Sequence, residues 1–173
     1  MVRKNVLTYL MPALTASLLG LLFCIALYRY YMQMETITND IIVDHVEELA
    51  DIFKKIDKEC QIIGFEHEKN YIDFLNVAKF DGSEVGSMNL AYPSEWKGPY
   101  IKDNPTVQEK LYNVVVAKNG YYVAPGDGVV LANGKVIGKD IIINKDSDFD
   151  ALTSDSAALL YNNQPMARKF KDR

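Results

Sequence analysis

Four aspartates near the C-terminal end of the chain have the spacing of metal ligands, because three of them alternate along the sequence and the fourth follows five residues later. They are Asp146, Asp148, Asp150 and Asp155. Alternating carboxylates are typical of loops that surround Ca²⁺, a cation that binds oxygen atoms. The loop is not an EF-hand, because Ala151 and Ala157 stand where Gly and Glu would be required. We therefore predict either a calcium loop of another kind or a solvated acidic loop.

The other potentially reactive side chains form no catalytic motif. His45 and His67 each lack a second histidine at the spacing of a zinc site. Cys24 lies in an apolar run, and on one helix about 54 Å would separate it from Cys60, far too much for a disulfide. The glycines around Gly126 are not followed by a helix that could bind phosphate. We therefore predict a protein that is not an enzyme.

A run of 23 residues without a charge, from Val6 to Tyr28, predicts a transmembrane helix. As a helix it spans about 35 Å, against about 30 Å for the hydrocarbon core of a bilayer. Tyr9 near one end and Tyr28 at the other suit the two interfaces. A cleaved signal peptide, the alternative, has a shorter apolar region that ends in small residues. This run ends in bulky ones, which favours a retained anchor at residues 6–28.

The charges around this run predict its orientation. Arg3 and Lys4 precede the run, whereas Arg29 alone follows it closely. The positive-inside rule therefore puts residues 1–5 in the cytoplasm and the rest of the chain outside. Without Arg3 and Lys4 the chain has 17 basic and 23 acidic side chains, a net charge of −6. A net acidic domain argues against a nucleic-acid partner.

Helical periodicity continues beyond the span, over residues 29–63. Apolar side chains recur there at intervals of three, four and their sums, which is typical of an amphipathic helix. They are Met34, Ile37, Ile41, Leu49, Ile52 and Ile56. No Gly or Pro interrupts this stretch, and Gly64 offers a C-terminal stop. We expect the stripe to pack against its own domain or against another subunit.

The remainder predicts a globular domain over residues 64–164 and a solvated basic tail over 165–173. Residues 66–79 have the apolar pattern of a second, shorter helix, and Ser154-Asp155 could cap a last helical turn. Beyond residue 112, short β-branched runs alternate with turn pairs such as Asn119-Gly120, which favours an antiparallel meander. The expected fold class is α+β, with the long helix packed on this meander.

A short aromatic motif, Trp96-Lys97-Gly98-Pro99-Tyr100, lies between the helical part and the predicted strands. Gly98-Pro99 favours a turn, and Trp96 and Tyr100 can hold that turn against a core. The motif and the order of elements resemble the type IV pilin superfamily, and most closely the major pseudopilin of type II secretion systems. The resemblance implies a pilin-like fold and a calcium site in the C-terminal loop.

The N-terminus departs from the pilin pattern, since no Gly precedes the apolar run and no acidic residue appears before Glu35. The prepilin cleavage motif is therefore not matched, which favours a protein that stays in the membrane. The resemblance implies a subunit of a secretion or pilus-type assembly in a bacterial inner membrane, with its C-terminal domain periplasmic or extracellular. It implies envelope subunits and, through the long helix, further copies of the chain as partners. The alternative is an anchored scaffold or ligand-binding domain of another envelope complex.

Overall fold

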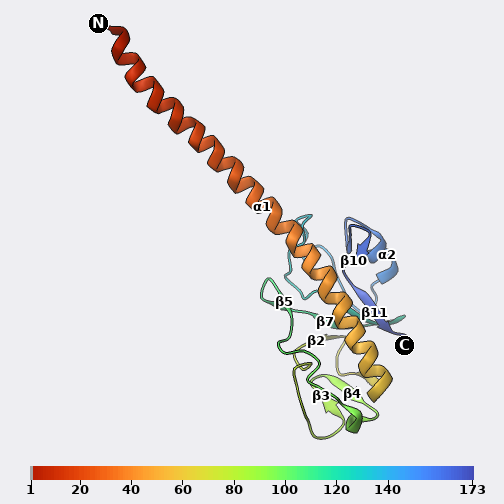
Figure 1. Cartoon of the computed structure of the whole chain (residues 1–173). Helices are drawn as coiled ribbons and strands as arrows, with labels where there is room; N and C mark the ends of the chain where they lie inside the picture. The colour runs from red at the N-terminus through yellow and green to blue at the C-terminus, as the bar shows by residue number, and fades with distance from the viewer. Residues whose placement is uncertain (1) are drawn as a thin grey trace. The chain divides into compact units, whose positions relative to one another are not determined.

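The computed structural model describes residues 2–173, with side chains at 10–30 and 37–173. The chain divides into two compact units, residues 1–37 and residues 38–173. Helix α1, Val2–Cys60, supplies all of the first unit and the beginning of the second (Figure 1). Each unit is described by itself.

The first unit is helical and apolar. Leu10–Tyr30 has a mean hydropathy of 2.2 and none of it is buried within the protein. Among the described residues it is the one helix long and apolar enough to cross a membrane. Pro12 lies within α1 without ending it, and the Thr15 hydroxyl donates to the carbonyls of Met11 and Pro12. Length and composition thus suit either an anchor or a signal sequence.

The larger sheet of the second unit is antiparallel and has four strands in the order β11-β8-β7-β2. These strands are β2 (Lys69–Tyr71), β7 (Asn113–Ala117), β8 (Gly120–Ala124) and β11 (Arg168–Lys171). The predicted hairpin forms between β7 and β8, which pair from Asn113 with Ala124 to Ala117 with Gly120. The two edge strands come from before and after this hairpin in the sequence, so the sheet is not a simple meander.

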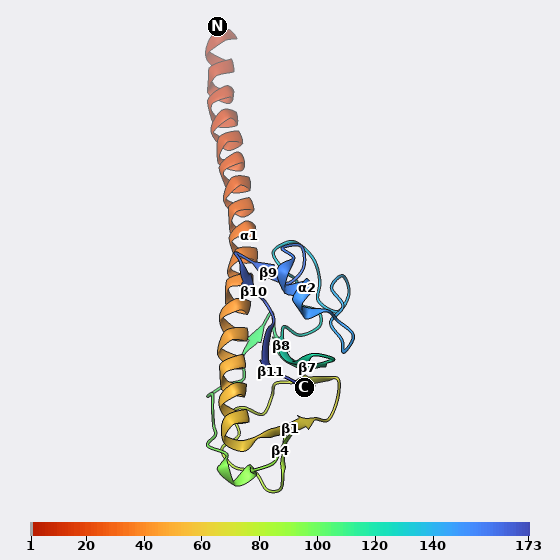
Figure 2. The ribbon, with the colours of Figure 1, turned by 90° about the vertical axis from the view of Figure 1, so that its right-hand side faces the viewer.

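A smaller antiparallel sheet has the order β1-β4-β3. Its strands are β1 (Ile62–Phe65), β3 (Glu84–Val85) and β4 (Met88–Leu90). Two short hairpins and two short helices complete the unit: β5 (Thr106–Val107) with β6 (Lys110–Leu111), β9 (Leu160–Tyr161) with β10 (Gln164–Pro165), η1 (Pro93–Glu95) and α2 (Phe149–Ser154). Both views place β4 by the C-terminal end of α1 (Figures 1 and 2).

The core of the second unit lies between α1 and these sheets. The buried side chains of α1 recur every three or four residues, so they line one face of the helix. They include Ile42, Val46, Leu49, Phe53, Ile56 and Cys60. The Phe53 ring stacks on Phe170 of β11, with 4.8 Å between centroids, and meets Phe74 edge-on. The α+β class, with a long helix packed on antiparallel sheets, is confirmed.

Helix α1 ends three residues earlier than the sequence predicts. Its last residue is Cys60, and Gln61 then adopts a left-handed backbone with φ of 54°. The backbone N–H of Gln61 donates to Asp57 O, and that of Ile62 donates to the Asp57 side chain. The carbonyl and the carboxylate of Asp57 thus accept the two backbone N–H groups that follow the helix. The helix therefore ends without using Gly64 as its C-terminal cap.

The helix predicted over residues 66–79 is wrong. Burial alternates strictly from Asn70 to Phe74, which is the period of an extended chain, and β2 lies in this stretch. The side chain of Asn70 accepts from the His67 N–H and donates to the His67 carbonyl, which fixes a turn before the strand. Backbone pairing of β2 with β7, together with this turn, outweighs the weak helical pattern of residues 66–79.

Two further predictions also differ from the structure. The β-branched runs after Val129 form isolated bridges, Val130 with Val136 and Ile137 with Ile141, rather than strands. The last helix is α2, capped by Asp148 instead of Ser154-Asp155. The residues around Leu160 form a hairpin instead, because Asn162 and Asn163 both take the positive φ that a tight turn requires.

The C-terminal segment expected to be a solvated basic tail contains β11. Lys171 forms an ion pair with Asp57 of α1 at 2.7 Å, and Arg168 approaches Glu47 of α1 at 3.3 Å. Phe170 points into the core between these two basic residues. Strand pairing with β8 and these contacts with α1 hold the segment in place.

Candidate functional site

The aromatic motif forms a compact loop within the second unit. The indole nitrogen of Trp96 donates to the carbonyl of Val77 at 3.0 Å. The same ring meets Phe80 and Tyr100 edge-on, at centroid distances of 5.4 and 4.8 Å. Gly98 lies so close to the Trp96 ring and to the Val77 carbonyl oxygen that a Cβ at this position would collide with both. Pro99 follows through a cis peptide bond.

The same loop attaches to the C-terminal end of α1. Lys97 pairs with Glu59 at 3.1 Å, and Lys55 lies 5.6 Å from the centre of the Tyr100 ring. Burial raises the pKa of Tyr100 to about 12. Burial and the neighbouring Glu59 carboxylate also raise the pKa of the Cys60 thiol, which hydrogen-bonds to Tyr100. A thiol with a raised pKa is a poor nucleophile. The contacts of this cluster attach the loop to the C-terminal end of α1.

The acidic loop uses its carboxylates for separate local purposes. Asp146 pairs with Lys118 at 2.8 Å, and the hydrogen bond from Lys118 lowers its pKa. Asp148 accepts from the Ala151 N–H at 3.1 Å as the N-cap of α2, and Asp155 accepts from the Ala157 N–H at 2.8 Å.

Asp150 lies in the first turn of α2, where its charge favours the helix. Within residues 10–30 and 37–173, no group of three metal-ligating side chains comes together. The structure therefore does not gather the four aspartates into a calcium site, the first of the two possibilities that their spacing left open.

The predicted packing stripe is divided by the structure. Leu49 and Ile56 are buried in the core, and Ile52 is partly buried against it. Ile37 and Ile41 are 54% and 37% exposed, and the side chain of Met34 lies outside the described residues. The domain contacts a helix face that includes Val46 and Phe53, so this face contains only part of the stripe that the sequence indicated.

A groove with a mixed polar and apolar lining, which the sequence did not indicate, lies beside α1. It has a volume of about 480 Å³ and is lined by His45 and Glu48 of α1 and by the loop from Tyr100 to Pro105. The Nδ1 atom of His45 lies 3.0 Å from the hydroxyl of Tyr112, a buried tyrosine whose pKa burial raises. No sequence spacing links these residues, because they lie 67 positions apart.

We compared the chain with known protein families, proteins and structures. No family model, curated protein or solved structure matches this chain. The likeness of the Trp96 motif to that of pseudopilins therefore stays a prediction from the sequence.

Proposed function

We propose that this chain is a non-enzymatic, pilin-like subunit of a membrane-bound assembly in a bacterial envelope, most like a secretion or pilus-type machine. Its N-terminal helix would anchor it once in the inner membrane. The second unit would be presented on the far side and would contact other subunits, including further copies of the chain, through the exposed side of α1.

The observation that carries this proposal is that the two parts of α1 differ in what their apolar side chains contact. Leu10–Tyr30 buries none of its apolar surface in the protein, whereas residues 42–60 form one wall of the core. Lipid is the solvent that suits an exposed apolar helix of this length. The same helix leaves Ile41 partly exposed in the second unit, and an apolar side chain in water gains free energy when a partner covers it.

The contacts made by the motif loop and the acidic loop support a structural role. In both places, the polar side chains already hydrogen-bond to or pair with neighbours that build the fold. The aromatic motif, which carries the pilin resemblance, supports it in the same way, because its contacts attach the loop to α1.

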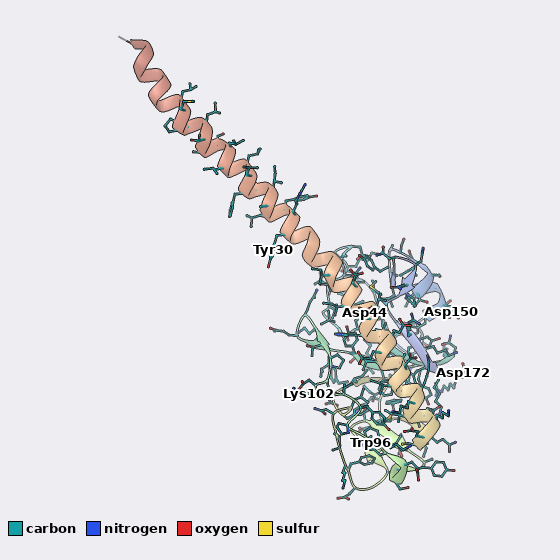
Figure 3. The ribbon with its side chains drawn as sticks, in the orientation of Figure 1. Tyr30, Asp44, Trp96, Lys102, Asp150 and Asp172 are labelled. Atoms are coloured by element: carbon teal, nitrogen blue, oxygen red, sulfur yellow. The ribbon has the colours of Figure 1, made fainter. Side chains whose placement is uncertain are left out.

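Cross-linking in native membranes tests the proposal. Cysteine would replace Ile41 or, one turn further on, the exposed Asp44, in a Cys24→Ser background; Asp44 is labelled in Figure 3. We expect a bifunctional thiol reagent to capture neighbouring subunits at both positions, and mass spectrometry would identify them.

Ile142→Cys is the matched control, because this isoleucine is also exposed, at 54%, but lies outside α1, between β8 and α2. Capture at Ile41 and Asp44 without capture at Ile142 supports assembly through α1. No capture at the helix positions, or equal capture at all three, contradicts it.

The intact mass of the membrane-extracted protein tests whether the N-terminus is retained. The anchor proposal predicts a mass that includes residues 1–30. Loss of the whole apolar segment would instead identify a signal sequence, and loss of a few N-terminal residues would favour a processed filament subunit.

A further inference from the structure

The outer face of the sheet β1-β4-β3 has a hollow that the fold leaves unfilled. Its volume is about 320 Å³, and all three strands and the turn between β3 and β4 line it. The sheet lies by the C-terminal end of α1 (Figure 2), and Figure 3 labels Trp96 in the same region. Ile63, Glu66 and Glu84 are exposed, so this surface is open to solvent.

Two glycines shape this hollow for different reasons. Gly86 has a φ of +56°, and a Cβ there would collide with the Phe74 ring, so the fold requires glycine at this position. Gly64 lacks the left-handed φ, and a Cβ added there meets no atom within 4 Å. The space above Gly64 is open, and packing does not explain why it is empty.

Among the described residues that line the hollow, the charged side chains are all acidic. Glu66 and Glu84 contribute two exposed carboxylates. The Asn89 amide donates to Glu84 Oε1 at 3.3 Å, which leaves the Asn89 carbonyl oxygen as an acceptor. None of the described residues that line the hollow is a lysine or arginine. Glu66 lies 3.5 Å from His67, whose imidazole is charged only when protonated.

An apolar side chain completes the surface. Ile63 lines the hollow and is 62% exposed. The neighbouring Ile62 backbone is already occupied, because its N–H donates to Asp57 and its carbonyl accepts from Lys171. An incoming strand therefore cannot pair with β1 at Ile62, which leaves the face of the sheet beside Ile63 as a surface for a partner.

We propose that this face docks a partner protein through a basic side chain, with arginine as the best fit. The guanidinium group donates to the carboxylates of Glu66 and Glu84 and to the Asn89 carbonyl, while its aliphatic stem packs on Ile63. This inference rests on the proposed assembly role and adds a second contact surface to it. Arginine is favoured over lysine because its planar fork can satisfy several acceptors at once.

A titration of the full chain in nanodiscs, followed by backbone amide NMR, tests the inference. The probe is Nα-acetyl-L-arginine amide, and Nα-acetyl-L-citrulline amide is the uncharged control of nearly the same shape. We expect saturable shifts of the Gly64, Gly86 and Asn89 amides with arginine amide, with a dissociation constant on the order of millimolar. We expect citrulline amide to give no saturable shift at these positions.

Three variants localise the binding. Glu84→Gln should weaken it at least about threefold through loss of one carboxylate, and Gly64→Leu should abolish it by filling the hollow. Asp44→Asn removes an exposed carboxylate on α1 and should leave the dissociation constant unchanged. Unchanged amide shifts elsewhere in the spectrum establish that each variant is folded.

The inference is overturned if arginine amide gives no saturable shift at these amides, if citrulline amide binds equally, or if Gly64→Leu leaves binding intact. These outcomes are distinguishable from failure of the assembly proposal, which is decided by cross-linking at Ile41 and Asp44. Negative cross-linking with positive binding here would leave a docking surface on a protein that does not assemble through α1.

Discussion

Asp148 illustrates how a residue that looks like a metal ligand can serve the backbone. Its carboxylate accepts from the Ala151 N–H at the start of α2. Asp148→Ala should lower the free energy of unfolding by about 1 kcal/mol, the usual cost of a lost N-cap. Asp148→Asn should be nearly neutral, because Asn caps helices as well as Asp does. Denaturant unfolding of the full chain in detergent would measure both.

The same pair of variants separates capping from calcium binding. We expect the unfolding free energy of the wild type to be equal in calcium and in a chelator. Stabilisation of the wild type by calcium, lost in Asp148→Asn, would instead favour a calcium loop over a solvated acidic loop.

Tyr100 should make the protein sensitive to alkali. Its pKa rises from 10 in the unfolded chain to about 12 in the folded one, because burial disfavours the phenolate. The unfolded state therefore loses this proton first, so stability is constant below about pH 10 and falls as the pH rises from about 10 to 12. Tyr100→Phe should make this decline less steep. The measurement is the denaturant midpoint of the variant and of the wild type at a series of pH values. A decline of equal slope in both proteins would contradict the assignment.

At the scale of the element, the motif loop depends on close contact between Gly98 and Trp96. A Cβ at position 98 would collide with the indole and with the Val77 carbonyl. Gly98→Ala should therefore cost about 1–3 kcal/mol of stability by overpacking. Gly64→Ala is the control, because a Cβ there meets nothing within 4 Å and should change stability by less than about 0.5 kcal/mol. Equal effects at the two glycines would show that backbone entropy, not packing, governs both.

Strand β11 is joined to α1 by a half-buried ion pair. Lys171 and Asp57 expose 23% and 27% of their side chains, and Lys171 also donates to the Ile62 carbonyl. Lys171→Met should lower the free energy of unfolding by about 1–3 kcal/mol, because the Asp57 carboxylate and the Ile62 carbonyl each lose a donor. Lys118→Met breaks an exposed pair with Asp146, at 77% and 56% exposure, and should cost less than about 1 kcal/mol. Thermal or denaturant unfolding of the two variants in parallel measures the difference, and a larger loss for Lys118→Met would contradict this ranking.

At the scale of the whole molecule, the proposed topology makes a labelling prediction. Lys102 is exposed and lies at the periphery of the second unit (Figure 3). A membrane-impermeant maleimide should label Lys102→Cys in intact cells with a permeable outer layer, and should label Lys4→Cys only after lysis. The wild type should remain unlabelled, because Cys60 is fully buried and Cys24 lies within the apolar segment. Labelling of Lys102→Cys only after lysis would reverse the proposed orientation.

The sequence alone determined the features that depend on local pattern. An unbroken run of apolar residues predicts a helix long enough to cross lipid whatever follows it. The hairpin of β7 and β8 was likewise predictable, since Asn119-Gly120 lies between a β-branched run and a run of two tyrosines and a valine, which favours a tight turn. The α+β class followed from the order of these patterns.

Only the tertiary structure decided which surfaces meet. The buried face of α1 includes Val46 and Phe53, because the sheets contact that side and leave Ile41 exposed. The basic C-terminus became β11 because β8 offered a free edge and Asp57 offered a counter-charge. The hollow beside Gly64 arose because residues from three strands converge there. Long-range pairing sets such contacts, and one sequence read locally does not contain them.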